Sequence, residues 1–275
     1  MLSNIVNDVY NRMAEAKPVN EEHLKLFLEN MRSLMLTTLE EERRIGGRNT
    51  LRMSSIGKAD RKIWLELNKS KEQKEFDGQF LIRMLYGNIV EELLLLLVRE
   101  AGYSVTDEQK EVVLNGVKGH IDCKINGYVV DIKSASDYGF RKFKNGFHND
   151  DDFGYIGQLS GYVDAEGGDV GFFLAMNKST GELALLEVDS IDMINASGRI
   201  DHLRFILSDK EALPPPCEEP KIEKSSGNKK LPRICRFCEY KQDCWPNLRG
   251  FKYSRGVTYF TEIFKEPRVE EVNIG

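Results

Sequence analysis

The most informative segment of this chain is Gly119-His120-Ile121-Asp122-Cys123-Lys124-Ile125-Asn126-Gly127-Tyr128-Val129-Val130-Asp131-Ile132-Lys133. Asn-Gly between alternating apolar residues predicts a hairpin with a two-residue type I′ turn, because that turn needs positive φ at both central positions. With this loop, three apolar pairs share one face of the hairpin. They are Ile125 with Tyr128, Cys123 with Val130, and Ile121 with Ile132. That face is expected to point into the core.

The opposite face of the hairpin carries the charged residues. The same register places Asp122 opposite Asp131, and His120 opposite Lys133. Like charges directly across a sheet destabilise it, so the two aspartates need a compensating cation. Mg²⁺ takes carboxylate oxygens, waters and phosphate oxygens as ligands. The pattern therefore predicts a metal site for phosphodiester hydrolysis. The alternative is a surface ladder whose charges point into solvent.

Two predicted helices bring further polar groups. The helix expected over residues 79–100 carries Glu91 and Glu92 just before a run of leucines, which implies burial of that helix. The two glutamates point about 100° apart, so only one can face the site. The helix expected over residues 154–165 places Gln158 and Tyr162 on one face, four residues apart.

In this order, these motifs resemble the PD-(D/E)XK nuclease superfamily. Gly119-His120-Ile121-Asp122 is similar to the G-x-x-D strand of its RecB and Cas4-like branch, and Asp131-Ile132-Lys133 to its D-x-K strand. Gln158-Leu159-Ser160-Gly161-Tyr162 matches the Q-x-x-x-Y motif of that branch. Gly87-Asn88-Ile89-Val90-Glu91 and residues 52–64 resemble its upstream helix and N-terminal segment. The likeness covers about residues 50–250 and is greatest to viral exonucleases of this branch.

The resemblance implies a role for each matched residue. One or two Mg²⁺ or Mn²⁺ ions would be bound by Glu91, Asp122, Asp131 and the Ile132 carbonyl. His120 would either bind a metal ion as well or form a hydrogen bond to one of these ligands. Lys133 would orient the attacking water or help to deprotonate it, and would stabilise the charge that develops on the phosphate. Burial beside cations is expected to lower its pKa. Gln158 and Tyr162 would position the DNA strand. Backbone phosphates are expected at Ser54, Ser55 and Arg61.

Cysteines near the C-terminus resemble the cysteine cluster of the same branch, in the spacing Cys235-x2-Cys238-x5-Cys244. The family's fourth cysteine, in the N-terminal segment, is replaced here by Ala59. Cys217 is the candidate for the missing ligand. Four thiolates suit either Zn²⁺ or a [4Fe–4S] cluster, and the spacing does not choose between them. Cys123 belongs to the apolar hairpin face and is expected to be a buried hydrophobic residue.

Composition fits a compact protein and shows one basic region. The chain has 275 residues, 41% of them hydrophobic, and a net charge of −5. Its longest apolar run, Leu93 to Val98, is too short to span a membrane. Residues 221–255 contain ten Lys or Arg against three acidic residues. Within this region Lys229, Lys230 and Arg249 are predicted phosphate contacts.

The fold class predicted from these patterns is α/β. The core is expected to be PD-(D/E)XK, restriction-endonuclease-like, with a central mixed sheet flanked by helices. The predicted domains are an N-terminal helical segment (1–50), the nuclease core (51–213) and a C-terminal cysteine-rich, basic, metal-binding region (214–275). Strands 110–114, 117–125 and 128–135 are expected to form a meander, joined by strands 170–176 and 184–188. Residues 136–152 are expected to be a loop beside the site.

The predicted function is metal-dependent DNA exonuclease activity in recombination, replication or degradation of DNA, with a phage as the suggested source. The expected partner is DNA, together with a recombinase or annealing protein, a helicase or a single-strand-binding protein, and no membrane. The expected location is the cytoplasm, or the host cytoplasm for a viral protein. Two alternatives stay open: a structure-selective endonuclease, and a catalytically silent DNA-binding or assembly module of the same fold.

Overall fold

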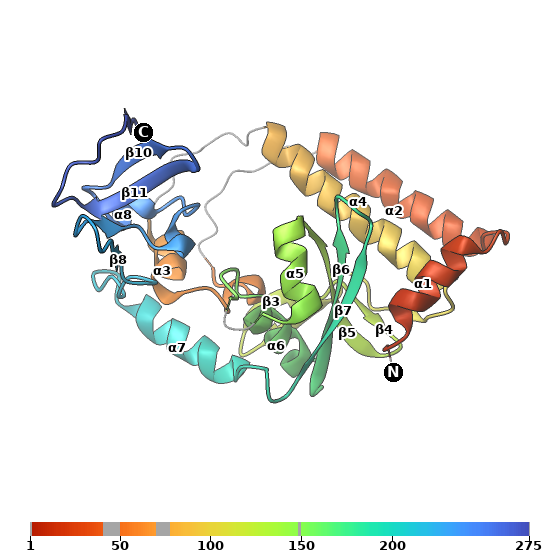
Figure 1. Ribbon diagram of the computed structural model, residues 1–275. Coiled ribbons are helices and arrows are strands. Elements are labelled where there is room, and N and C mark those ends of the chain that lie inside the picture. Colours follow the sequence, from red (N-terminus) through yellow and green to blue (C-terminus); the bar gives the residue numbers. More distant parts are fainter. Residues whose placement is uncertain (1, 41–49, 70–77, 148–149, 275) are drawn as a thin grey trace. The chain divides into compact units, whose positions relative to one another are not determined.

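The computed structural model describes residues 2–40, 50–69, 78–147 and 150–274 (Figure 1). Its contacts group the chain into two compact units. Residues 1–57 and 70–203 make up the first, here called the sheet unit, and residues 58–69 and 204–275 make up the second, here called the cysteine unit. Residues 58–69, expected within the nuclease core, thus make their contacts with the C-terminal region. Among the described residues no helix is long and apolar enough to cross a membrane.

A central five-stranded sheet organises the sheet unit, in the order β1-β4-β5-β6-β7. Its strands are β1 (Val105–Thr106), β4 (Cys123–Ile125), β5 (Tyr128–Ala135), β6 (Val170–Asn177) and β7 (Leu183–Asp189). β5 and β6 run parallel, whereas the other neighbours run antiparallel. The predicted mixed sheet is therefore confirmed.

Helices cover both faces of this sheet (Figure 1). They are α1 (Ile5–Ala14), α4 (Gly78–Glu100), α5 (Asp137–Asn145) and α6 (Tyr155–Ala165). Helix α2 (Glu21–Glu40) packs on α4, and α7 (Ala196–Ser208) leads into the cysteine unit. One hydrophobic core joins apolar side chains of α1 and α4 to those of β4, β5 and β6. The opposite face of the sheet packs against α5 and α6. Within the predicted N-terminal helical segment, α1 and α2 form helices up to Glu40, and residues 41–49 lie outside the described residues.

The hairpin has the predicted register, with Cys123 opposite Val130 and Ile125 opposite Tyr128. Asn126 and Gly127 both have positive φ, at 48° and 86°, as the type I′ turn requires. The predicted meander is wrong, because its middle strand breaks before Cys123. β2 (Glu111–Leu114) and β3 (Val117–His120) form a separate two-stranded sheet.

The break is stabilised by backbone hydrogen bonds around Ile121 and Asp122. The Ile121 N–H donates to the Lys110 carbonyl at 3.1 Å, and the Asp122 carbonyl accepts from the Gln109 N–H at 3.1 Å. Ile121 is buried there. The chain therefore leaves the ladder at Asp122, and His120 does not lie opposite Lys133.

A second prediction, a loop over residues 136–152, is also wrong, because residues 137–145 form α5. Ser136 caps the helix by accepting a hydrogen bond from the Gly139 N–H at 3.5 Å. Phe140 and Phe143 bury one side of the helix. Lys142 and Lys144 lie in the last turn, where cations are favourable. Arg141 and Lys144 lie on the exposed side of this amphipathic helix.

Glycines allow the N-terminal segment to pack closely on α6. The 3₁₀ turn η1 (Met53–Ser55) inserts Met53 between Gly119 and Gly161. A Cβ on Gly119 would lie 2.5 Å from the Met53 Cβ and 2.6 Å from the Tyr162 Cε1. The glycine of the G-x-x-D motif is thus required by packing.

The cysteine unit has its own small sheet, in the order β12-β10-β11-β9-β8. Its elements are α3 (Asp60–Asn68), β8 (Lys221–Ile222), β9 (Lys229–Lys230), η2 (Arg233–Cys235), α8 (Lys241–Cys244), β10 (Arg249–Tyr253), β11 (Gly256–Glu262) and β12 (Glu271–Val272). Helix α3 is bound to the C-terminal chain by two hydrogen bonds. The Arg61 Nε–H donates to the Pro214 carbonyl at 2.6 Å, and the Trp64 Nε1–H to the Asp209 carbonyl at 3.0 Å.

Candidate active site

Asp131 is the most deeply buried charged residue of the site. Its side chain is 0% exposed. Oδ1 accepts a hydrogen bond from the Gln158 Nε2 at 3.2 Å, and Oδ2 forms an ion pair with Lys133 but accepts no hydrogen bond. Burial raises the pKa of Asp131, while Lys133 partly offsets that rise. Both oxygens of this buried carboxylate thus have a nitrogen partner, and Oδ2 has a cationic one.

Asp122 lies beside Asp131 without a ladder pair. Its Oδ2 accepts a hydrogen bond from the Ile132 N–H at 2.7 Å, so the side chain replaces the strand partner that the break removes. Burial, followed by the Asp131 charge, raises the pKa of Asp122 well above its ordinary value. The predicted proximity of the two carboxylates is present, although a side-chain hydrogen bond brings it about.

The Lys133 ammonium group contacts both a carboxylate and an aromatic ring. Its side chain is 20% exposed and pairs with Asp131, and its Nζ lies 5.4 Å from the centre of the Tyr155 ring. Burial acts to lower the pKa of Lys133, but the Asp131 and Asp122 charges outweigh it and raise that pKa above its ordinary value. The expected lowering of this pKa beside bound cations stays a prediction, because the charges that act on Lys133 here are those of anions.

Gln158 and Tyr162 lie one helical turn apart on α6, as predicted. The Gln158 Nε2 donates to the Tyr162 hydroxyl at 3.2 Å as well as to Asp131. Tyr162 is only 3% exposed, and burial raises its pKa to about 12. Gln158, itself bonded to Tyr162, thus holds the Asp131 carboxylate through its Oδ1 atom.

Glu91 reaches the same site from α4. Its Oε1 accepts a hydrogen bond from the Gln109 Nε2 at 2.8 Å. Burial raises the pKa of Glu91 to about 7, the Glu92 and Asp131 charges act in the same direction, and Lys133 opposes them. Glu92 instead accepts a hydrogen bond from the Asn30 Nδ2 at 3.0 Å. Of the two glutamates, Glu91 is thus the one coupled to the aspartates.

Three acidic groups around one ammonium leave an excess of negative charge. Because burial and mutual repulsion raise the pKa of all three carboxyl groups, a divalent cation would relieve a strain that Lys133 relieves only in part. Oxygen donors of this kind suit Mg²⁺ or Mn²⁺. Within the described ranges, however, no three His, Cys, Asp or Glu side chains already converge as a metal site.

Other predicted site residues lie elsewhere. His120 is opposite Glu111 on β2, with its Nε2 3.9 Å from the Glu111 Oε2, and its side chain is 56% exposed. Its predicted position across from Lys133 is therefore wrong. Ser54 and Ser55 lie on η1 in the sheet unit, whereas Arg61 lies on α3 in the cysteine unit.

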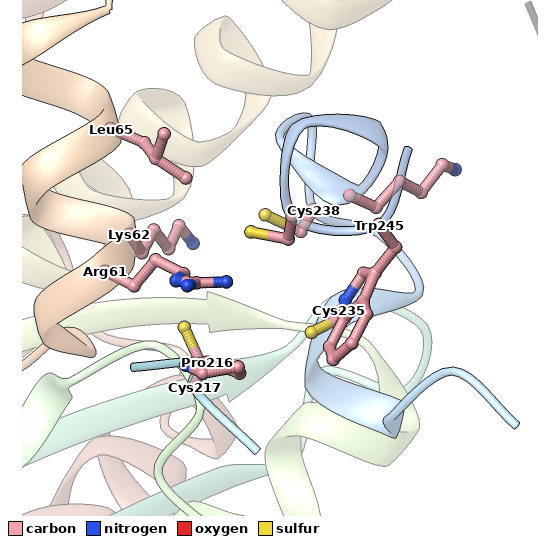
Figure 2. Close-up of a pocket in the computed structure, with 10 residues that line it drawn as sticks. Arg61, Lys62, Leu65, Pro216, Cys217, Cys235, Cys238 and Trp245 are labelled. Carbon is pink, nitrogen blue, oxygen red and sulfur yellow. The ribbon is translucent and has the colours of Figure 1, made fainter. Parts of the chain in front are cut away.

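The four C-terminal cysteines line one small cavity of the cysteine unit (Figure 2). Figure 2 shows the thiols of Cys217, Cys235 and Cys238 around the Arg61 guanidinium, and Cys244 lines the same cavity. No disulfide joins these cysteines. The predicted grouping of Cys217 with the other three is therefore visible, and Arg61 faces sulfur atoms.

Burial favours the protonated form of three of these thiols. It raises the pKa of Cys235 to about 12, with help from the other three cysteines, and it also raises the pKa of Cys217 and Cys244. Hydrogen bonding from Arg61 opposes the rise at Cys244, and Trp245 opposes it at Cys235. The buried Nε1 of Trp245 has no hydrogen-bond acceptor of good geometry. If a cation bound these sulfurs as thiolates, Cys244 would accept a hydrogen bond from Arg61 and Cys235 would accept one from Trp245.

The basic residues predicted to contact phosphate are paired with carboxylates. Lys229 lies 2.8 Å from Glu262, and Lys230 lies 2.6 Å from Glu223. Arg249 binds Glu266 at 2.6 Å and Glu271 at 2.7 Å. Contact with DNA would require these exposed pairs to open.

Sequence reasoning missed two residues that touch the site, Tyr155 and Gln109. Tyr155 lies three residues before Gln158, one turn earlier on the same helix, so helical spacing could have identified it. Gln109 lies outside any helix or strand and has no such signal.

No protein-family model matches the chain, and no curated protein matches it. Among solved structures, similar ones include an alkaline exonuclease from Laribacter hongkongensis, with 14% identity, a TM-score of 0.39 and coverage of 57% of this chain and 89% of that chain. Another is a phage-related exonuclease from Haemophilus somnus, with 15% identity, a TM-score of 0.39 and coverage of 65% and 89%. Likeness of this degree does not assign the chain to a family.

Proposed function

We propose that this protein is a divalent-metal-dependent DNA exonuclease. The observation that carries the proposal is the buried pair Asp122 and Asp131, which lies beside Glu91 and against Lys133. Buried carboxylates of raised pKa next to an ammonium group are characteristic of functional sites. A purely structural ion pair would not need two surplus acids.

The residues would divide the chemistry of phosphodiester hydrolysis among them. Glu91, Asp122, Asp131 and the Ile132 carbonyl would hold one or two Mg²⁺ or Mn²⁺ ions. A bound ion would supply a Lewis acid and lower the pKa of an attacking water. Lys133 would donate hydrogen bonds to the phosphate oxygens as negative charge develops on them. Gln158, fixed by Tyr162, would keep the Asp131 carboxylate oriented.

The cavity of the cysteine unit is proposed as a second, structural metal site. Cys217, Cys235, Cys238 and Cys244 are four sulfur donors around one cavity, which suits either Zn²⁺ or a [4Fe–4S] cluster. Support comes from the buried Trp245 Nε1–H, whose nearby acceptor would be a Cys235 thiolate.

The proposed function is tested by incubating the purified protein with linear duplex DNA labelled separately at its 5′ and 3′ ends, and with covalently closed circular DNA, in Mg²⁺ or Mn²⁺. We expect metal-dependent release of end label from linear DNA, with the circular DNA left intact. The end that is released first gives the polarity.

Other outcomes select the alternatives. Cutting of the closed circle, or internal cuts at junctions and nicks, would establish an endonuclease. Binding of linear, nicked and single-stranded DNA without cleavage in either metal would identify a silent DNA-binding module. A protein that neither binds nor cleaves any of these DNAs would overturn the proposal.

A further inference from the structure

An exposed aromatic residue lies at the edge of the candidate active site. Phe153, in the sheet unit, lies two residues before the start of α6, and its side chain is 59% exposed. Single exposed apolar side chains are common and need no explanation by themselves. Phe153 differs because its ring stacks on Tyr155, with ring centres 5.5 Å apart and planes inclined by only 24°.

Tyr155 joins this exposed ring to the reactive groups. The centre of the Tyr155 ring lies 5.4 Å from the Lys133 Nζ, and Lys133 pairs with Asp131. Two contacts of 5.4 and 5.5 Å in series thus lead from the ammonium group to the solvent-facing ring of Phe153.

The ring pair has a rigid support. Tyr155 packs against Phe143, Phe147 and Phe173, with ring centres 5.6, 6.0 and 6.3 Å away. Asp151 accepts hydrogen bonds from the Tyr155 N–H at 2.9 Å and the Ile156 N–H at 2.8 Å, which fixes the start of α6. A ring held in this way loses little conformational entropy when it binds a ligand.

We propose that Phe153 and Tyr155 form a stacking platform for an unpaired nucleobase of the DNA strand whose phosphate lies at Lys133. This inference rests on the proposed nuclease function. Stacking on an aromatic ring tolerates any base, because every base has a π face. The platform would hold an unpaired strand end, so the preferred substrate would be DNA with a frayed or single-stranded terminus.

The test places 2-aminopurine, a base whose fluorescence falls on stacking, at successive positions of a short single-stranded oligonucleotide. Binding is measured in Ca²⁺, to slow hydrolysis. Wild type should quench the probe at one position near the end. Phe153→Ala and Phe153→Leu should lose that quenching, whereas Phe153→Trp should keep it. An abasic residue at that position should weaken the binding of the oligonucleotide to wild type about tenfold. The same abasic residue should not change the affinity of Phe153→Ala for the oligonucleotide.

Phe205→Ala is the matched control, because Phe205 is also exposed and lies on α7. It should behave as wild type. Phe153 is exposed, so its substitution should leave the circular dichroism spectrum and the melting temperature unchanged. Quenching that persists in Phe153→Ala, or that occurs at no position while wild type still cleaves DNA, would overturn the platform and leave the nuclease standing. Absence of both cleavage and binding in wild type would overturn the nuclease itself.

Discussion

At the scale of single residues, the site is a problem of charge compensation. Lys133 supplies one positive charge to a cluster that includes Glu91, Asp122 and Asp131. Its pKa is raised because its neighbours are acids, so the ammonium form persists at neutral pH. We propose that Lys133 stabilises the negative charge that develops on the phosphate.

Glu91 gives a test of this compensation in metal-free protein. Its pKa of about 7 exceeds the ordinary value of 4.5, so the folded state binds its proton more tightly than the unfolded state does. The stability it contributes is complete at low pH and is lost as pH rises through about 7. Glu91→Gln should therefore raise the free energy of unfolding of the metal-free protein at pH near 8, by on the order of 2 kcal/mol. At pH near 5 the substitution should have little effect.

Urea unfolding in EDTA at the two pH values measures this difference. Glu187→Gln is the control, since Glu187 is exposed on β7, and it should change stability at neither pH. If Glu91→Gln changed the free energy of unfolding equally at both pH values, burial would not be raising the pKa of Glu91. Excess Mg²⁺ should remove the advantage of Glu91→Gln, because the carboxylate then has a cation partner.

The identities of the central residues could be predicted from sequence, but some of their contacts could not. Alternation along the hairpin identified Asp122, Asp131 and Lys133, because side chains on a strand alternate between faces. The break at Ile121 could not be predicted, since it depends on the hydrogen bonds that Ile121 donates to Lys110 and that Asp122 accepts from Gln109, both in the preceding segment of the chain. His120 was misplaced for the same reason.

At the scale of elements, close packing of three segments sets the geometry of the site. Met53 of η1 fills the space left by Gly119 on β3 and Gly161 on α6. Tyr162 also lies against Gly119, and Tyr162 accepts the hydrogen bond from Gln158. Packing at the motif glycine is thus connected to the orientation of Asp131.

Substitution of this glycine should disturb both stability and activity. In Gly119→Ala the new Cβ would lie 2.5 Å from the Met53 Cβ, so Met53 and Tyr162 must shift. Overpacking of this kind costs about 1–3 kcal/mol. We expect a lower melting temperature and a lower cleavage rate, measured by thermal unfolding and end-label release.

The matched control is Gly78→Ala at the start of α4, where a Cβ would meet nothing within 4 Å. Alanine at such a helical site should be neutral or slightly stabilising. If Gly119→Ala had the same melting temperature as Gly78→Ala and cleaved DNA at the wild-type rate, the packing explanation of the motif glycine would be wrong.

Element types were predictable where the periodicity was long. Helix α4 and the strands β6 and β7 agree with their apolar patterns. Helix α5 was missed because its sequence has clustered charges, and its buried Phe140 and Phe143 were not weighed as a helical stripe. The positive charge of residues 221–255 also misled, since partners such as Glu262 and Glu271 lie beyond that window.

At the scale of the whole molecule, the contacts do not follow chain order. Residues 58–69 leave the sheet unit and pack with residues 204–275, where Arg61 contacts the cysteine cavity. No local pattern signals this exchange, because it depends on contacts between segments far apart in the sequence. Metal binding at the four cysteines would therefore fix α3 together with the C-terminal sheet.

Loss of one ligand should expose that dependence. Cys217→Ser should lower the Zn or Fe bound per chain and speed proteolysis within residues 204–275, measured by elemental analysis, visible absorbance and limited digestion. Because burial raises the thiol pKa values, metal affinity should weaken as pH falls. Cys123→Ala is the control, since Cys123 is buried in the sheet unit, and it should keep its metal. Unchanged metal content in Cys217→Ser would remove Cys217 from the ligand set.

The central claim is that Lys133 and its neighbouring carboxylates hydrolyse DNA. The most direct measurement compares wild type with Lys133→Ala on one end-labelled linear duplex in Mg²⁺, with cleavage rate and DNA affinity recorded on the same preparations. We predict that Lys133→Ala loses cleavage by a factor of about 100 or more while it binds DNA with similar affinity. Cleavage at the wild-type rate by Lys133→Ala would contradict the account.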